Sequence, residues 1–415
     1  SNGLEKRPKL RFPGFDEPWN TALLSDYFVK STKKNSDGMI SNVICNSAKQ
    51  GLIPQREYFD KDIANSDNTN GYYIIESNDF VYNPRKSADA PYGPISSYQY
   101  PEAGIVSPLY LCFRAKREIN PLYFEWYFRS STWHRYIYMS GDSGARHDRV
   151  SIKDDVFFAM PINVPSAKEQ EKISLFLDVI ERRIETQRTL VETLKKYKRG
   201  LSDTLFDRTA QSPSCKIVKL GDAFELLQNN TFSRDDLTTN PSSVQNIHYG
   251  DVLVKYGAVA NISEYTPPYI KPTINLQKFV ATSYLRDGDI VFADTAEDYS
   301  VGKATEIAGA NGLAVLSGLH TIPCRPLMKF HPMYLAYYFN SSLFRRQIYP
   351  LVQGTKVSSI SKGELVKTSV YAPTEREQRR IASMLYLLDL RITFEEKTVN
   401  ALTNTRTALL QQLFI

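Results

Sequence analysis

The sequence Pro165-Ser166-Ala167-Lys168-Glu169-Gln170 returns 208 positions later, from 165 to 373, as Pro373-Thr374-Glu375-Arg376-Glu377-Gln378. From there the two copies match without a gap as far as Phe206 and Phe414. Each copy carries apolar residues at alternating steps of four and three, which is the pattern of a helix that packs along a single seam. A proline stands just before each copy, where a helix start tolerates it. The repeat predicts two long helices of about 40 residues, each roughly 60 Å in length.

The segments ahead of the two long helices repeat as well. Tyr127-Phe128-Arg129-Ser130-Ser131 matches Tyr338-Phe339-Asn340-Ser341-Ser342, and the spacing of the aromatic residues predicts an amphipathic helix. Asn78-Asp79-Phe80-Val81-Tyr82 matches Gly288-Asp289-Ile290-Val291-Phe292, which is typical of a turn followed by a buried strand. Base-stacking platforms are the competing interpretation of the aromatic residues, but their helical spacing favours a place in the core. The residues concerned are Tyr123, Tyr127, Phe128, Tyr334, Tyr338 and Phe339.

The order of these segments divides the chain into four parts. Residues 1–160 and 209–368 form two related globules, and residues 161–208 and 369–415 form the long helices. Because each globule mixes strand and helix patterns, we predict an α+β protein in which two tandem-related α/β globules are separated by the two helices. We expect the helices to pair as an antiparallel coiled coil, with a pseudo-two-fold axis between the globules.

Polar residues interrupt the seam of each helix at two positions, Gln187 and Lys198 in the first helix and Glu395 and Arg406 in the second. In a parallel pair Lys198 would meet Arg406, and the two cations would repel. An antiparallel register can place Lys198 opposite Glu395 and Gln187 opposite Arg406, while the apolar seam residues in the overlap face one another. Because polar seam residues fix the register of coiled coils, we predict this arrangement.

Composition excludes several classes of protein. The 415 residues carry a net charge of +6, which leans towards an anionic partner without proving one. No apolar run reaches the roughly 18 residues of a membrane-spanning helix, and the N-terminus lacks the apolar core of a signal peptide. The four cysteines are scattered without a paired spacing, which argues against a zinc ribbon or a disulfide scaffold and favours a cytoplasmic protein with structural thiols. They are Cys45, Cys112, Cys215 and Cys324.

Catalytic motifs are incomplete. The string nearest to the Asp/Asn-Pro-Pro-Tyr/Phe turn of an amino-methyltransferase is Thr266-Pro267-Pro268-Tyr269, where threonine lacks the carboxylate or amide acceptor. Val301-Gly302-Lys303 lacks the upstream glycine and the following Ser or Thr of a phosphate-binding loop. No nucleophile or metal ligand accompanies His147-Asp148 in the sequence. We therefore expect a chain that is not itself an enzyme.

The chain resembles the specificity subunits of Type I restriction–modification systems over nearly its whole length. Residues 8–15, Pro-Lys-Leu-Arg-Phe-Pro-Gly-Phe, with Trp19 resemble the N-terminal signature of that family. Asn83-Pro84, Pro91-Tyr92-Gly93 and Gly104-Ile105-Val106-Ser107-Pro108-Leu109-Tyr110 resemble one type of its recognition domain. The Pro-x-x-x-Glu-Gln-x-x-Ile helix start and a closing Leu-Phe both appear twice, and this duplicated order is more specific than any single motif.

The resemblance implies that the two globules are target-recognition domains, each reading one half of a bipartite, asymmetric site in double-stranded DNA. It also implies two modification subunits that dock on the helices, and restriction subunits that join them. S-adenosylmethionine, ATP and Mg would be bound by those partners and not by this chain. A non-catalytic scaffold that joins protein partners through its helices is the alternative that the residues leave open.

Direct readout of DNA needs cationic, amide or hydroxyl side chains on loops that reach the major groove. The candidates in the first globule are Lys49, Gln50, Arg85, Lys86, Tyr92, Arg146, His147 and Arg149. The candidates in the second globule are Lys255, Tyr256, Thr295, Tyr299, Lys303 and Lys356. Arg146 and Lys356 both stand just ahead of a matched Ser-Ile pair, which indicates a shared role. An idle, solvated surface side chain is the competing interpretation for each candidate.

Overall fold

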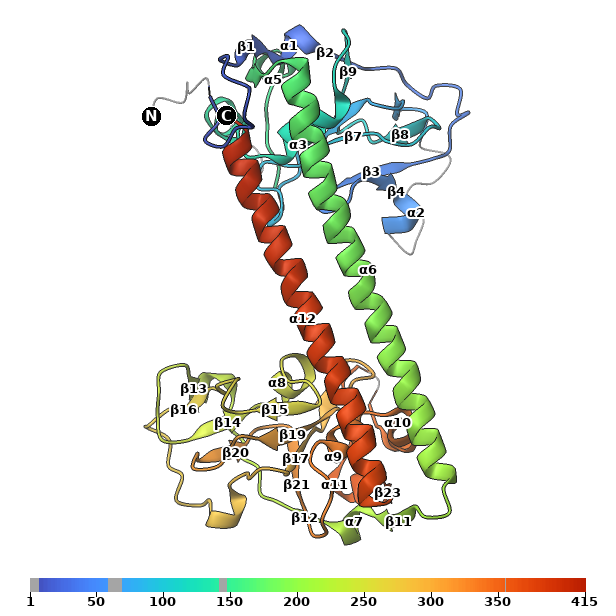
Figure 1. Ribbon diagram of the computed structural model, residues 1–415, viewed down its shortest axis with the longest axis vertical. Helices are drawn as coiled ribbons and strands as arrows, with labels where there is room; N and C mark the ends of the chain where they lie inside the picture. Colours follow the sequence, from blue (N-terminus) through green and yellow to red (C-terminus); the bar gives the residue numbers. More distant parts are fainter. Residues whose placement is uncertain (1–6, 59–68, 142–147, 355) are drawn as a thin grey trace. The chain divides into compact units, whose positions relative to one another are not determined.

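The computed structural model describes residues 7–58, 69–141, 148–354 and 356–415, which form two compact units. Unit 1 comprises Ser1–Arg188 and Lys397–Ile415, and unit 2 comprises Thr189–Glu396. Each unit therefore holds one α/β globule and one half of each long helix, α6 (Ala167–Gln211) and α12 (Glu375–Leu413) (Figure 1). Among the described residues, no helix is both long and apolar enough to span a membrane.

The globule of unit 1 is built on a four-stranded sheet with the strand order β2-β9-β6-β7. Its elements are β1 (Asn20–Leu23), α1 (Leu24–Tyr27), β2 (Phe28–Lys30), β3 (Ile44–Ser47), β4 (Gly51–Pro54), α2 (Gln55–Tyr58), β5 (Tyr73–Ile75), β6 (Phe80–Tyr82), β7 (Ile95–Ser97), β8 (Gly104–Val106), β9 (Leu111–Ala115), α3 (Pro121–Arg129), α4 (His134–Ser140), α5 (Asp154–Phe158) and β10 (Pro161–Val164). Helix α3 packs against β7, and β1 pairs with β10 beside the start of α6.

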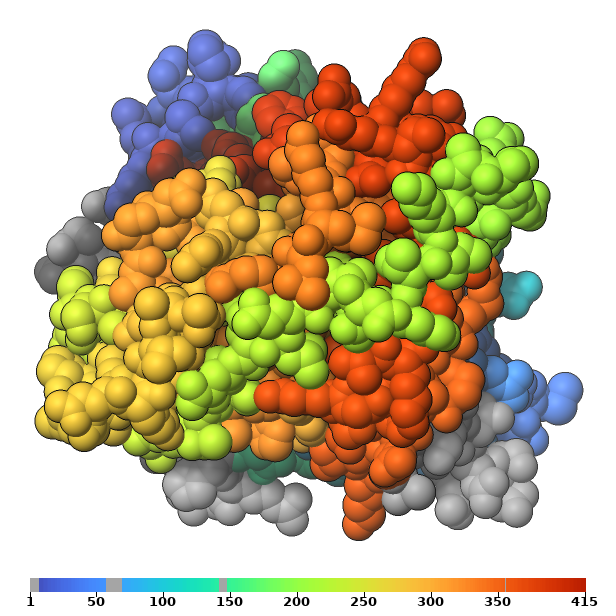
Figure 2. Space-filling view, turned by 90° about the horizontal axis from the view of Figure 1, so that it is seen from below, coloured from blue at the N-terminus to red at the C-terminus, as the bar shows by residue number. Residues whose placement is uncertain are grey.

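The globule of unit 2 is built on a five-stranded sheet with the order β12-β21-β17-β19-β15, and a second sheet has the order β13-β16-β14-β20. Its elements are β11 (Lys216–Lys219), α7 (Leu220–Ala223), β12 (Phe224–Leu226), β13 (Leu237–Thr238), β14 (Gln245–Ile247), α8 (Tyr249–Val254), β15 (Val259–Asn261), β16 (Tyr269–Ile270), β17 (Ile290–Ala293), β18 (Thr295–Ala296), β19 (Ala304–Ala308), β20 (Val315–Ser317), β21 (Thr321–Pro326), α9 (Tyr334–Phe339), α10 (Ser342–Ile348), β22 (Ser358–Ser359), α11 (Lys362–Leu365) and β23 (Ser369–Ala372). Helix α9 packs against β19, and β11 pairs with β23. Figure 2 shows the end of this unit where the chain passes from α6 to β11, drawn in yellow-green.

A buried aspartate organises the central strands of both globules in the same way. Asp79 accepts hydrogen bonds from the guanidinium of Arg114, with Nε 2.6 Å from Oδ1, and Asp289 accepts them from Arg325, with Nε 2.9 Å away. The residue before each aspartate has a left-handed backbone, with φ of 68° at Asn78 and 88° at Gly288. The matched sequence segments therefore build matched turns, because Asn and Gly tolerate this conformation best.

The aromatic residues ahead of the long helices are buried, as their helical spacing predicted. They are Tyr123, Tyr127, Phe128, Tyr334, Tyr338 and Phe339. The closing phenylalanine of each long helix completes these cores: the ring of Phe414 lies 5.6 Å from Tyr123, and that of Phe206 lies 5.8 Å from Tyr338. The end of one long helix therefore packs into the core of each globule, α12 in unit 1 and α6 in unit 2.

The two long helices run antiparallel, as predicted. In unit 1, Leu177 near the start of α6 shares a core cluster with Leu410 near the end of α12. In unit 2, Leu205 near the end of α6 shares a cluster with Ile381 near the start of α12. The repeated Gln of the helix-start motif closes the turn before each helix, because its side-chain amide donates to the carbonyl of the preceding proline at 2.9 Å in both copies.

The predicted register of the helices is wrong. That register was based on four polar seam residues, Gln187, Lys198, Glu395 and Arg406. In the structure Lys198 forms an ion pair with Asp389, and Arg406 forms one with Glu181 at 2.5 Å. Both partners lie six positions before the expected ones, at 389 instead of 395 and at 181 instead of 187, a slip of about one heptad. The long Lys and Arg side chains reach acidic residues that flank the seam, so seam positions alone did not decide the alignment.

Candidate nucleic-acid interface

Four segments of unit 1 that are distant in sequence line one groove of about 780 Å³. They are the turn after β3, the loop after β6, the turn between β8 and β9, and the segment that begins at Asp148. Five predicted residues line the groove, namely Lys49, Gln50, Arg85, Lys86 and Arg149. Ser107, Leu109 and Tyr110 line the same wall and were not among the predicted contact residues, although the segment that contains them resembles part of a recognition domain.

Buried polar groups hold the groove loops in place. The side-chain amide of Asn46 donates to the carbonyl of Val81 at 2.7 Å, and its oxygen accepts from the Ser96 hydroxyl at 2.9 Å. Gly93 has φ of 81°, and a Cβ there would lie 2.1 Å from the carbonyl oxygen of Asn83. Only glycine fits this close approach of two backbones, so the Pro91-Tyr92-Gly93 motif has a structural cause.

Backbone hydrogen bonds join the loop after β6 to the segment that begins at Asp148. The Lys86 N–H donates to the carbonyl of Asp148 at 2.8 Å, and the Val150 N–H donates to the carbonyl of Pro84 at 2.9 Å. This pairing places Arg85 opposite Arg149. Their like charges face one groove, an arrangement that an anion between them would stabilise.

The charge of the groove is mostly positive. Its lining holds four cationic side chains, Lys49, Arg85, Lys86 and Arg149, and one acidic side chain, Asp89. Lys49 Nζ lies 3.5 Å from a carboxylate oxygen of Asp89. The Nε of Arg149 makes no hydrogen bond within the described residues, but it lies 3.8 Å from a carboxylate oxygen of the neighbouring Asp148. A groove with these cations suits a polyanion such as the phosphate backbone of DNA.

Unit 2 repeats the loop pairing of unit 1 with different side chains. The Ile360 N–H donates to the carbonyl of Asp294 at 2.9 Å. This hydrogen bond is equivalent to the one between Val150 and Pro84 in unit 1, because both of its residues lie 210 positions later in the chain, at 360 instead of 150 and at 294 instead of 84. In unit 2 the pairing extends into strands β18 and β22, where Thr295 faces Ser359. Thr295 therefore occupies the place of Arg85.

The exposed candidates of unit 2 are Tyr299, Lys356 and Lys255. Tyr299 lies between β18 and β19, and Lys356 lies in the loop just before β22. Lys255 follows α8 directly, and its ammonium lies 5.9 Å from the centre of a neighbouring tyrosine ring. These three side chains remain available for contact with a partner.

Two candidates of unit 2 are turned towards the protein: Tyr256 is buried and Lys303 is half-buried. Tyr256 is 1% exposed and packs in a core cluster, so its ring cannot contact DNA. Lys303 donates its ammonium to the carbonyl of Leu253 at 2.7 Å, and burial, with the nearby charge of Arg345, lowers its pKa. Sequence reasoning placed both side chains outside because a tyrosine or lysine in a loop gives no sign of the side it faces.

Three candidates of unit 1 lie elsewhere or outside the described residues. Tyr92 does not line the groove: its ring lies 4.9 Å from that of His134, and its carbonyl accepts the hydroxyl of Tyr82 at 2.8 Å. It is half-buried and packs at the edge of the core. Arg146 and His147 are outside the described residues.

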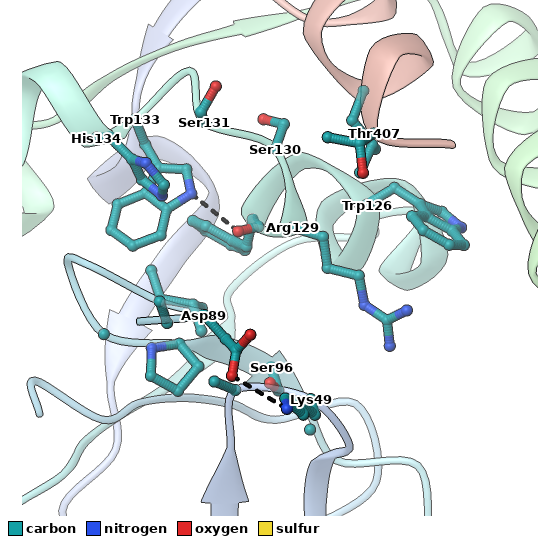
Figure 3. Close-up of a pocket in the computed structure, with 18 of the residues that line it drawn as sticks. Lys49, Asp89, Ser96, Trp126, Arg129, Ser130, Ser131, Trp133, His134 and Thr407 are labelled. Atoms are coloured by element: carbon teal, nitrogen blue, oxygen red, sulfur yellow. Dashed lines mark hydrogen bonds and ion pairs between the residues drawn. The ribbon is translucent and has the colours of Figure 1, made fainter. Parts of the chain in front are cut away.

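A second hollow of about 310 Å³ in unit 1 joins the groove loops to the helices. Lys49 and Asp89 form part of its wall, and Glu181 and Arg406, the ion pair between the helices, form another part. Figure 3 shows the Lys49–Asp89 ion pair on one side of this hollow and Thr407 of α12 on the other. The loop that carries Lys49 is therefore packed close to the helix pair.

The described residues contain no group of three or more His, Cys, Asp or Glu side chains that could hold a metal ion. The four cysteines are free thiols, and burial raises the pKa of Cys112 to about 12. A thiol with such a pKa is a poor nucleophile, so Cys112 serves as a small core residue, and Cys324 is buried as well, whereas Cys45 and Cys215 are half-buried.

Comparisons with known proteins show the fold. The sequence matches no protein-family model and no curated protein. In structure it is similar to a chain from a study of complex assembly and conformational transition of the type I R-M system, with 16% identity, 98% of this chain and 99% of that chain covered, and a TM-score of 0.60. It is also similar to the S subunit of a Type I restriction–modification system from M. genitalium, with 14% identity, 99% of each chain covered, and a TM-score of 0.52. The chain therefore has the fold of a Type I specificity subunit from end to end.

Proposed function

We propose that this chain is the DNA-specificity subunit of a Type I restriction–modification complex. The observation that carries the proposal is the basic groove of unit 1, in which Lys49, Arg85 and Arg149 converge on a chain with the specificity-subunit fold. The cations would hold the phosphate backbone, and the Gln50 amide and Ser107 hydroxyl in the same groove would contact base edges.

The target is a bipartite, asymmetric site of which each globule reads one half. The repeated turns, sheets and loop pairing give both globules one framework. The side chains on that framework differ, since the loop pairing brings Arg85 opposite Arg149 in unit 1 but Thr295 opposite Ser359 in unit 2. Guanidinium and hydroxyl groups make different hydrogen bonds with base edges, so the two half-sites differ in sequence.

The partners are two modification subunits, docked on the long helices, and restriction subunits that join them. Val179 of α6 and Leu387 of α12 occupy equivalent positions 208 residues apart and are 62% and 63% exposed. A repeated exposed apolar position suits two copies of one partner. Methylation and cleavage then belong to the partners, which bind S-adenosylmethionine, ATP and Mg, and this chain is not itself an enzyme.

Mapping DNA methylation in a host with and without this gene tests the proposal. We expect a bipartite motif that is methylated only when the chain is present. The purified chain, incubated with labelled S-adenosylmethionine and DNA, should transfer no label. An assembled complex that binds DNA without sequence preference would favour the scaffold alternative instead.

Groove variants sharpen this test. Replacing Arg85 and Arg149 with alanine should weaken DNA binding by the complex at least tenfold and flatten its salt dependence, because two phosphate contacts are lost. Alanine at Lys34, an exposed lysine outside the groove lining, is the matched control and should change neither quantity.

A further inference from the structure

An exposed leucine stands in the wall of the basic groove of unit 1. Leu109 is 59% exposed and lies in the turn just before β9. The Ser107 hydroxyl accepts from the Leu109 N–H at 3.3 Å, and the Ser107 carbonyl accepts from the Tyr110 N–H at 3.0 Å, so the turn is held. A single exposed leucine is ordinary on a surface. In the major groove of DNA, however, such a side chain has one specific apolar partner, the 5-methyl group of thymine.

The same position in unit 2 is occupied by a histidine. In unit 1 Tyr82 pairs with Leu111, and in unit 2 the matched residue Phe292 pairs with Ile322. Counting back two residues from each partner leads to Leu109 and to His320. The two side chains are therefore equivalent on the common framework and differ in chemistry.

His320 is fixed in an orientation that leaves one ring nitrogen available. Its backbone is left-handed, with φ of 53°, and its carbonyl accepts from the Asp294 N–H at 3.1 Å. Nδ1 lies 3.3 Å from a carboxylate oxygen of Asp294, and the ring lies 5.3 Å from that of Tyr249. The side chain is 47% exposed, and no described residue pairs with Nε2. In the tautomer whose Nδ1 proton is directed at the carboxylate, Nε2 is the hydrogen-bond acceptor of the ring.

The neighbours of His320 place it at the candidate interface of unit 2. Asp294 supplies the carbonyl of the repeated loop pairing, and the Thr295 hydroxyl lies 3.4 Å from His320 Nδ1. Thr295 is the counterpart of Arg85, which lines the groove of unit 1 with Leu109. The histidine thus stands beside the second globule's loop pair as the leucine stands beside the first.

We propose that Leu109 and His320 are equivalent base-reading positions of the two globules. Leu109 contacts a thymine methyl group in one half-site. His320 accepts a hydrogen bond from an exocyclic amine, adenine N6 or cytosine N4, in the other. The inference rests on the proposed function and names the chemistry by which it selects bases.

The experiment uses the full chain assembled with its modification subunits. It measures binding to DNA duplexes that contain the target motif identified by methylation mapping. Uracil replaces thymine at one position at a time, which removes one methyl group. We expect one uracil position in one half-site to weaken wild-type binding roughly fourfold, the effect of one buried methyl group. The Leu109→Ala complex should show no loss at that position. His320→Leu should relax the preference at one adenine or cytosine of the other half-site by about tenfold or more.

Matched controls are Met39→Ala in unit 1 and Leu313→Ala in unit 2, which alter exposed apolar side chains outside the candidate loops. Both should keep the wild-type profile. If Leu109→Ala retains every uracil effect, or His320→Leu keeps full base preference, the proposed reading position is wrong while the specificity function stands. If the wild-type complex shows no sequence preference at all, the proposed function itself fails with it.

Discussion

At the scale of single residues, contacts within the protein determine which candidate side chains remain accessible to a partner. Lys303 and Arg149 are both loop cations that the sequence marks as candidates. The ammonium of Lys303 is held by the Leu253 carbonyl, whereas Arg149 lines an open groove. A long cationic side chain can bury its stem and satisfy its charge on a carbonyl, so residue type alone does not separate the two cases.

Glu306 provides a test of burial at one residue. It lies on β19, is 5% exposed, and accepts from the N–H groups of Met333 at 2.7 Å and Ala336 at 3.1 Å. Burial raises its pKa from 4.5 to about 7, although the two hydrogen bonds oppose the rise. Because the folded state binds this proton more tightly, the contribution to stability is fully present below pH 4.5 and is lost as the pH rises through about 7.

We predict that Glu306→Gln, which stays neutral, removes this pH dependence from unit 2. Between pH 4.5 and 7 the free energy of unfolding of the wild type should fall by on the order of 2 kcal/mol more than that of the variant. Amide hydrogen exchange of α9 across this pH range, with correction for intrinsic exchange, reports the difference. Gln in place of the exposed Glu118 is the control, and equal pH profiles for wild type and Glu306→Gln would contradict the prediction.

At the scale of elements, the helix pair is aligned by charges beside the seam. Arg406 and Glu181 of unit 1 are mostly shielded from solvent, with side chains 22% and 17% exposed. We predict that Arg406→Glu destabilises unit 1 by about 1–3 kcal/mol, because a charge-assisted hydrogen bond is replaced by repulsion. The double variant Arg406→Glu with Glu181→Arg should recover most of the loss.

Tryptophan fluorescence during urea unfolding measures this effect in unit 1. All three tryptophans, Trp19, Trp126 and Trp133, belong to that unit. The control is Arg182→Glu, at a pair with Asp178 whose arginine is exposed and which should contribute less than about 1 kcal/mol. A double variant no more stable than Arg406→Glu would argue that this pair does not set the register.

The outer faces of the helices lead to a prediction about partners that rests on the proposed function. Val179→Lys or Leu387→Lys alone should reduce the modification subunits bound per chain from two to one, because each residue serves one docking site. Both changes together should leave neither bound. Mass measurement of the purified complexes reads the stoichiometry, with the exposed Thr186→Lys as control. Two subunits on the double variant would rule out these positions as docking contacts.

At the scale of the whole molecule, each globule carries its own candidate interface loops, but its core includes the end of a long helix, α12 in unit 1 and α6 in unit 2. The core of unit 1 includes Leu410, Leu413 and Phe414, which lie at the far end of the sequence. On the proposed function, we predict that exchanging residues 1–160 for those of a Type I specificity subunit, together with residues 409–415, changes one half-site and preserves the other. Methylation mapping in cells that carry the hybrid gene measures both halves.

A companion exchange of residues 1–160 alone separates packing from reading. The hybrid globule would then meet a foreign Leu-Phe helix end, and its mismatched core should lower stability without altering the new half-site. Loss of both half-sites in a hybrid that still assembles with its partners would contradict independent reading by the two globules.

The sequence by itself determined the architecture, because a repeat of 208 residues carries the same local preferences twice. Heptad spacing, helix-start motifs and the turn at Asn78 and Gly288 each act over a few neighbouring residues, so they can be read without knowing distant contacts. Three segments of the groove in unit 1 were also recognisable, because loop cations between buried strands stand out in the sequence.

Only the tertiary structure decided the register of the helices, the inward turn of Tyr256 and Lys303, and the place of Leu109 and His320 at the candidate interfaces. Each of these depends on pairing between residues far apart in the chain. Asp389 lies 191 positions from Lys198 in the sequence, and the apolar periodicity of neither helix indicates that the two side chains pair. Burial is likewise a property of the partner surface, which no local spacing encodes.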